Sequence, residues 1–141
     1  MNRNIKFTTN VLRNTCQQFL RKYSDQPTRV EKTVNSVTLL GRVGNEPQKR
    51  GNEQHPVVMF SIATHNNYKY ENGDWAQSTD WHRVVVFKPA LRESVLNFLK
   101  KGQRALVTGK ITYGEVIDPQ GKPRLSPSIV ADDVILFQGS S

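Results

Sequence analysis

Runs rich in strand-forming apolar residues, separated by polar turns, recur along the chain beyond residue 34. They predict strands over residues 34–43, 57–64, 79–87, 104–116 and 128–137. Gly41, inside the first of these, indicates a bulge or a sharp coil. Residues 89–101 instead predict a helix, because Pro89 suits a first helical turn, the apolar residues gather on one side and Gly102 follows as a stop signal.

Three polar segments lie before or between these elements. Residues 25–33 include a proline and predict a linker. Residues 44–56 contain two glycines and two prolines, which predict a loop or a broken edge segment. Residues 65–78 predict a long polar loop, a hairpin excursion around Asn72 and Gly73.

The order of three strands, one helix and two strands predicts an all-β fold, the five-stranded OB-fold, a small Greek-key barrel with a helix between strands three and four. A β-sandwich would need more strands and no such helix. In OB-folds the ligand lies across the second and third strands and on the loops between strands one and two and between strands four and five. The third predicted strand is therefore expected to face a ligand.

That strand has the sequence TDWHRVVVF, and its two faces differ. Trp81, Arg83 and Phe87 fall on one face together with Val85, whereas Val84 and Val86 fall on the other and are expected to point into the barrel. Aromatic rings stack on exposed bases and arginine pairs with phosphates, so this face suits single-stranded nucleic acid. The alternative is that both rings belong to the core and that Arg83 only reaches the rim.

The preceding polar segment interleaves rings with a cation. It contains Tyr68, Lys69, Tyr70 and Trp75. Aromatic residues in a loop have no core to fill unless the loop folds back, so this cluster favours binding. Further cations that could flank a binding groove are Lys32, Arg42, Lys49, Arg50, Lys88 and Lys110, although each taken alone suits an ordinary solvated charge.

The chain has a net charge of +8 and a pI of about 9.9, which favours an anionic partner. Much of that charge lies in residues 1–24, which hold five basic residues and no acidic one. Together with scattered apolar and hydroxylated residues, this composition predicts a mitochondrial transit peptide, and Arg21 to Ser24 resembles a processing site. The alternative is a basic arm that binds nucleic acid directly.

Several classes of function lack their sequence signals. Cys16 is the only cysteine, so an intramolecular disulfide is excluded. No run approaches the roughly 20 apolar residues that a membrane span needs. His55, His65 and His82 have no metal-binding spacing, and no nucleophile motif or phosphate loop is present. We therefore predict no enzymatic activity, no catalytic or metal-binding residues, no cofactor and no membrane partner.

Five segments together resemble a known family. They are NSVTLLGRVGNEP, VMFSIATHNNYK, TDWHRVVVF, LKKGQRALVTGKI and IVADDVILF. From Val34 to Phe137 the chain resembles the single-stranded DNA-binding protein family in its mitochondrial form. The resemblance implies an OB-fold domain over residues 34–137, a homotetramer, sequence-tolerant wrapping of single-stranded DNA, and a role in DNA replication and repair in the nucleoid of the mitochondrial matrix. It also implies stacking roles for Tyr68, Trp81 and Phe87.

The chain departs from the family pattern in two places. A further aromatic residue that the family usually has late in the hairpin of strands four and five is Val116 here, so either Tyr113 compensates or that contact is weak. Bacterial members carry a long Gly/Pro-rich tail with an acidic tip that recruits other proteins, whereas residues 138–141 are expected to form only a short tail.

The partners and the type of nucleic acid rest on the resemblance. It implies contacts with the mitochondrial replication machinery, a helicase and a polymerase. Only the resemblance favours DNA, because an RNA-binding OB-fold module, a mitochondrial RNA chaperone, would use the same stacking and phosphate pairing. A purely structural adaptor would need another account of the loop rings.

Overall fold

The computed structural model describes residues 30–139. In chain order its elements are β1 (Val37–Val43), β2 (Gln48–Gly51), β3 (Pro56–Lys69), β4 (Trp75–Val86), α2 (Pro89–Phe98), β5 (Arg104–Ile117) and β6 (Pro123–Leu136). The predicted transit peptide, residues 1–24, and most of the predicted linker, residues 25–33, lie outside the described residues.

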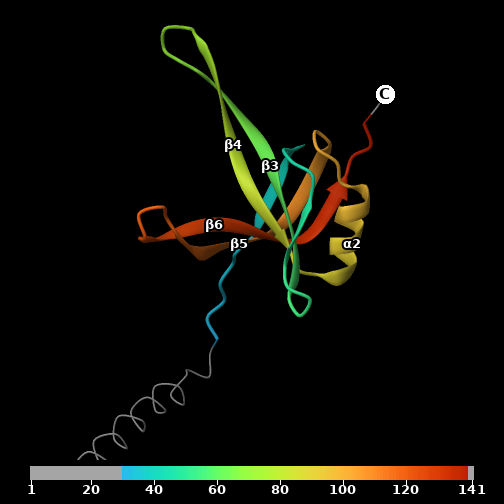
Figure 1. The fold of residues 1–141 in the computed structure, drawn as a ribbon. Helices are drawn as coiled ribbons and strands as arrows, with labels where there is room; N and C mark the ends of the chain where they lie inside the picture. The colour runs from blue at the N-terminus through green and yellow to red at the C-terminus, as the bar shows by residue number, and fades with distance from the viewer. Residues whose placement is uncertain (1–29, 140–141) are drawn as a thin grey trace, which may run out of the picture. The chain divides into compact units, whose positions relative to one another are not determined.

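Five of the strands close a barrel (Figure 1). Around the barrel the order is β1, β3, β4, β6 and β5, and β5 pairs back to β1. The β4–β6 pair is parallel and the other pairs are antiparallel, while β2 is a short edge strand on β3. The prediction of a five-stranded Greek-key barrel, with a helix between its third and fourth strands, is confirmed.

The barrel closes where β1 leaves β5 and meets β3. Arg42 pairs with Arg104 of β5 and also with Ala63 of β3. The two backbones come so close here that a Cβ atom on Gly41 would clash with the carbonyl oxygen of Ala63. Only glycine allows this approach, which explains the glycine inside the predicted first strand.

The core fills the barrel and extends beneath the helix. Its buried members include Phe60 and Ile62 of β3, Val84 and Val86 of β4, and Val95 of α2. Leu99, directly after α2, is buried in the same cluster. The helix ends at Phe98, earlier than the predicted Lys101, and Gly102 follows it with a φ of 83°.

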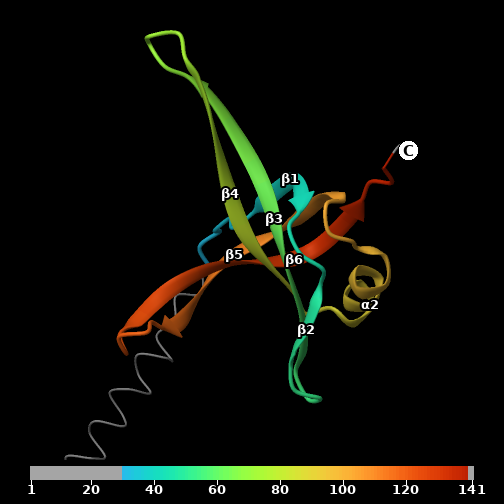
Figure 2. The ribbon, with the colours of Figure 1, turned by 45° about the horizontal axis from the view of Figure 1, so that its top comes forward.

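Two hairpins are longer than the sequence predicts. The predicted hairpin around Asn72 and Gly73 is confirmed, but the prediction that all of residues 65–78 form a loop is wrong, because β3 continues to Lys69 and β4 begins at Trp75, with a turn at Gly73 between them. Figures 1 and 2 show this hairpin and the β5–β6 hairpin as long ribbons that run beyond the barrel. Both faces of such a ribbon meet solvent, so its sequence carries no alternation of apolar and polar residues to mark the strands.

In the β5–β6 hairpin, the sequence analysis missed the start of β6 for another reason. β6 begins at Pro123 instead of the predicted Ser128, and it contains Pro127. Inside a strand, proline is tolerated where its side of the strand is a free edge, since it has no N–H to donate. The pairing of β6 with β4 is confined to Ile129 and Val130, so the earlier part of β6 has such an edge.

Candidate nucleic-acid interface

The outer face of β4 carries Trp81 and Arg83, and Phe87 follows directly after β4. Trp81 is 63% exposed and Phe87 is 52% exposed, and Arg83 is exposed between them. Val84 and Val86 are fully buried inside the barrel. The two rings therefore lie outside the core, and the alternative of a packed Trp81 and Phe87 does not describe this fold.

Trp81 lies against the segment that follows β1. A Cβ atom on Gly44 would clash with the six-membered ring of Trp81 and would lie 2.7 Å from Ser61 Oγ. The amide of Gly44 donates to the carbonyl oxygen of Ser61 at 2.9 Å, which holds the segment on β3. The absence of a side chain at residue 44 thus sets the position of the indole ring.

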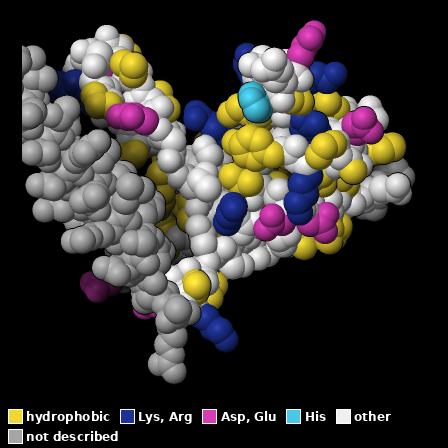
Figure 3. All heavy atoms as spheres, turned by 90° about the horizontal axis from the view of Figure 1, so that it is seen from below, with side chains coloured by type: hydrophobic (Ala, Val, Ile, Leu, Met, Phe, Trp, Pro, Cys, Tyr) yellow, Lys and Arg dark blue, Asp and Glu magenta, His cyan; other side chains and the backbone are white. Residues whose placement is uncertain are grey.

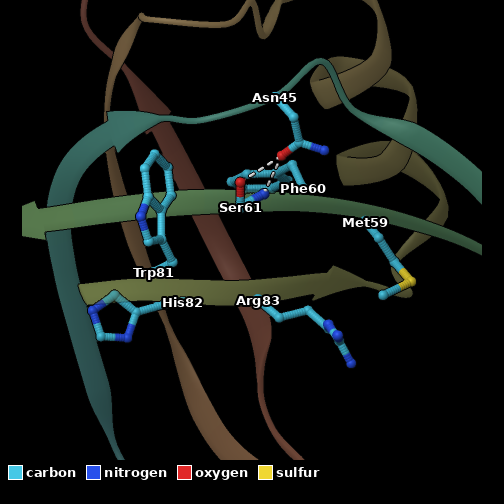
Figure 4. A pocket seen from close by; sticks show the side chains of 7 residues that line it. All are labelled: Asn45, Met59, Phe60, Ser61, Trp81, His82 and Arg83. Atoms are coloured by element: carbon cyan, nitrogen blue, oxygen red, sulfur yellow. Dashed lines mark hydrogen bonds between the residues drawn. The ribbon is translucent and has the colours of Figure 1, made fainter. Parts of the chain in front are cut away.

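Asn45 reinforces this attachment with its side chain. Its Oδ1 accepts hydrogen bonds from the backbone N–H of Ser61 at 2.7 Å and from Ser61 Oγ at 2.6 Å (Figure 4). A hollow of about 300 Å³ opens beside these groups. It is lined by Asn45, Met59, Phe60, Ser61, Trp81, His82 and Arg83.

Arg83 has no carboxylate partner among the described residues. Its Nη1 donates to Ser126 Oγ on β6 at 3.4 Å, a long hydrogen bond. Within residues 30–139 the ion pairs found are Lys88–Asp132 and Arg124–Asp118. The guanidinium group of Arg83 is therefore available to an anion on the same face as Trp81.

The β3–β4 hairpin carries aromatic residues on both faces beyond the barrel. By register Lys69 and Trp75 share the face of Trp81, and Lys69 Nζ lies 5.7 Å from the centroid of the Trp75 ring. Tyr68 lies on the opposite face, where it packs edge-on against Tyr70 with ring centroids 5.2 Å apart. All three of these rings are exposed, so the segment does not fold back onto the core.

The two tyrosines are also linked through their hydroxyl groups. The oxygens of Tyr68 and Tyr70 lie 3.2 Å apart in a hydrogen bond. This hydrogen bond and, to a smaller extent, desolvation raise the pKa of Tyr68 above its usual value. Tyr68 therefore stays a neutral ring at and above physiological pH, which suits stacking.

The predicted cationic side chains differ in whether a carboxylate of the protein already lies beside them. Arg42 Nη1 donates to the carbonyl oxygen of Gly102 at 3.0 Å and has no carboxylate partner within residues 30–139, and Lys110 is an exposed residue of β5. Lys88 Nζ donates to the backbone oxygen of Asp132 at 3.0 Å and lies 3.8 Å from its carboxylate. Asp132 thus competes with any phosphate for Lys88.

Tyr113 and Val116 lie on opposite faces of the β5–β6 hairpin. Tyr113 pairs with Pro127 and Val116 with Arg124, with no irregularity in the register between them. Both side chains are exposed. Tyr113 therefore presents a ring to solvent on this hairpin, but not on the face that Val116 occupies.

The histidines of the site have structural partners. His82 Nε2 lies 2.8 Å from Thr64 Oγ1, and His65 Nδ1 lies 2.9 Å from Thr79 Oγ1. Within residues 30–139 no group of three or more His, Cys, Asp or Glu side chains lies close enough together to hold a metal ion. The helix found in the same range is too short and too polar to cross a membrane.

Sequence reasoning missed the residues that support Trp81. Gly44, Asn45 and Ser61 are small or polar residues whose significance depends on which strand the segment after β1 lies against. No local pattern marks that contact. Figure 3 shows one surface of the molecule, where hydrophobic side chains are interspersed with Lys and Arg side chains.

The closed barrel, with an exposed ring and cation surface across β3 and β4, defines an OB-fold binding protein. The family model described as "Single-strand binding protein family" matches residues 34–137. The chain therefore belongs to the single-strand binding protein family, whose members are binding proteins.

Individual relatives support this assignment. The mitochondrial single-stranded DNA-binding protein of Drosophila melanogaster is 68% identical over 115 residues, which cover 82% of this chain and 79% of that protein. The Danio rerio protein of the same name is 38% identical and covers 90% of this chain and 95% of its own length. A solved structure of the Plasmodium falciparum SSB in complex with ssDNA superposes with a TM-score of 0.70 at 28% identity, covering 78% of this chain and all of that one.

Proposed function

We propose that this protein binds single-stranded DNA without a strict sequence requirement. The observation that carries the proposal is the exposed pair of Trp81 and Arg83 on the outer face of β4. Stacking on an exposed ring is available to every base, and an unpaired arginine neutralises phosphate whatever the sequence. Tyr68, Lys69, Trp75, Phe87 and Tyr113 extend the stacking surface, and Arg42, Lys88 and Lys110 extend the cationic one. The activity involves binding alone, with no chemical step.

The place of action is the mitochondrion, where the protein protects single-stranded DNA during replication and repair. The composition of residues 1–24 supports import into the matrix, and relatives from several animals are named as mitochondrial proteins. A replicative helicase and polymerase are the partners that such a role requires, because they expose and copy the strand.

The assembly is a homotetramer. A row of apolar side chains crosses the outer face of three neighbouring strands, from Leu40 on β1 through Leu106 on β5 to Ile135 on β6. Leu40 is 45% exposed and Ile135 is 48% exposed, so one barrel leaves this row uncovered. Burial against further copies would remove it from water. Analytical ultracentrifugation that finds only monomer at micromolar concentration would contradict this assembly.

The binding itself is tested by titrating tryptophan fluorescence with single-stranded and duplex DNA of matched length at two salt concentrations. We expect strong quenching by the single strand and weak binding of the duplex, whose bases cannot reach Trp81. Competition with an RNA oligonucleotide of the same sequence separates a DNA-binding from an RNA-binding function. Equal affinity for duplex and single strand would refute the proposal.

A further inference from the structure

The hollow beside Trp81 has walls of distinct chemistry. In Figure 4, Trp81 and Met59 lie at opposite ends of the hollow, with Ser61 between them. Asn45 comes from the segment after β1, and Arg83 comes from β4. A base that stacks on Trp81 would present its edge to the remaining walls.

The carboxamide of Asn45 has a fixed orientation. Because the backbone N–H of Ser61 can only donate, the atom that faces it at 2.7 Å must be the oxygen of Asn45. The Nδ2 group then points away from Ser61, and in Figure 4 it points toward the Met59 end. Asn45 therefore supplies a hydrogen-bond donor, and not an acceptor, to whatever enters the hollow.

Met59 makes the neighbouring wall apolar. It is half-buried on β3 and lies opposite Val85 of β4, which is itself buried. The thioether is flexible and polarizable, so it adapts to a small apolar group such as a methyl. The hollow thus places a donor beside an apolar contact.

Thymine carries the matching pair of groups, since its O4 acceptor is adjacent to its C5 methyl. Cytosine has an N4 amino donor at the same position, which would face the donor of Asn45, and uracil has no methyl group. We propose that the hollow between Trp81 and Met59 is a base subsite that prefers thymine, and that Asn45 and Met59 are the residues that set the preference. This inference rests on the proposed binding of single-stranded DNA.

The first test changes only the ligand. Short homo-oligomers of deoxythymidine, deoxyuridine and deoxycytidine have the same backbone, and their pyrimidine bases self-stack weakly. The affinities for deoxyuridine and deoxycytidine oligomers differ through the group at C4, an oxygen in the first and an amino group in the second. We expect a preference for deoxyuridine of about 2- to 10-fold per occupied subsite. Deoxythymidine and deoxyuridine compare the methyl group, for which we expect about 2- to 4-fold.

The second test changes the walls. In Asn45→Asp one carboxylate oxygen still accepts from Ser61, while the other replaces the Nδ2 donor by an acceptor. The preference for uridine over cytidine should therefore be lost or reversed, because a carboxylate accepts a hydrogen bond from the cytosine amino group. Met59→Ala should abolish the discrimination between thymidine and uridine, and Met59→Leu, the matched control, should keep it. Ratios of affinities are compared within each variant, so that the charge introduced by Asn45→Asp cancels.

The outcomes separate this inference from the proposed function. Ratios that stay at the wild-type values in folded Asn45→Asp and Met59→Ala proteins overturn the subsite, although the protein still binds DNA. If a variant does not fold, the wild-type comparison decides, and equal affinity for the three oligomers overturns the subsite. A wild-type protein that binds none of them refutes the proposed function itself.

Discussion

The ring of Trp81 rests on Gly44, and no other residue type fits at position 44 without moving the ring. The glycine is attached to β3 through the hydrogen bond from its N–H to Ser61, which limits how far the segment can retreat. The ring has room to move outward, since Trp81 is 63% exposed. A small change at Gly44 should therefore alter the binding surface without altering the core.

Gly44→Ala should weaken binding of single-stranded DNA and leave the fold intact. The added methyl displaces the ring, so we expect a loss approaching the roughly 1–3 kcal/mol of one base–aromatic contact. The slope of log affinity against log salt should not change, because no cation is removed. Gly114→Ala is the control, since that exposed glycine of β5 has nothing within 4 Å of the position of an added Cβ. Wild-type affinity in Gly44→Ala would argue against the inference that Gly44 sets the position of the Trp81 ring.

Trp81→Ala should cost roughly 1–3 kcal/mol of binding, the usual size of one base–aromatic contact. Because the side chain is largely exposed, the melting temperature should change little, whereas truncation of a core tryptophan costs about 3–5 kcal/mol of folding stability. Melting temperature and sedimentation, measured beside affinity, separate the two effects. A folded, oligomeric Trp81→Ala protein that binds like the parent would disprove the stacking assignment.

The sequence was sufficient to predict the barrel and to predict which residues of β4 face outward, because the alternation of side chains within residues 79–87 is a local property. It predicted the hairpin around Asn72 and Gly73 but not the length of β3 and β4, because the residues of this ribbon meet solvent on both faces and so lack a pattern. The sequence also could not predict the contacts that support the ring of Trp81, since Gly44 and Asn45 act only through tertiary contacts with β3 and β4. Finally, the strand register places Tyr68 and Trp81 on opposite faces of the hairpin. A segment predicted to be a loop has no register, so the sequence could not predict this difference.

Residues 1–30 fused to a reporter should carry it into mitochondria. The physical reason is the run of basic residues without acidic ones over residues 1–24, which suits import driven by a negative matrix potential. Fluorescence microscopy with a mitochondrial dye measures the distribution, and a fusion in which the basic residues of this segment are replaced by Gln is the control. A reporter that stays in the cytosol or enters the nucleus would count against the transit peptide.

Asp132→Asn should strengthen DNA binding. The substitution keeps the backbone oxygen that accepts from Lys88 but removes the carboxylate that competes with phosphate. Both side chains are 60% exposed, so the ion pair contributes little to folding and the melting temperature should hold. Asp133→Asn makes the same change of charge at a neighbouring exposed residue and serves as the control. If both variants gain affinity equally, the effect comes from net charge and not from the release of Lys88.

Arg83→Ala should lower affinity in a way that depends on salt, unlike Trp81→Ala. Loss of one phosphate contact on a single strand should reduce the magnitude of the slope of log affinity against log salt by about 0.7. The hydrogen bond to Ser126 is long and exposed, so its removal should hardly affect folding. Arg83→Lys keeps the charge and should restore most of the slope, although lysine cannot pair with phosphate through two parallel hydrogen bonds. An unchanged slope in Arg83→Ala, measured by titration over several salt concentrations, would remove Arg83 from the phosphate contacts and leave Lys69, Lys110 and Arg42 to supply them.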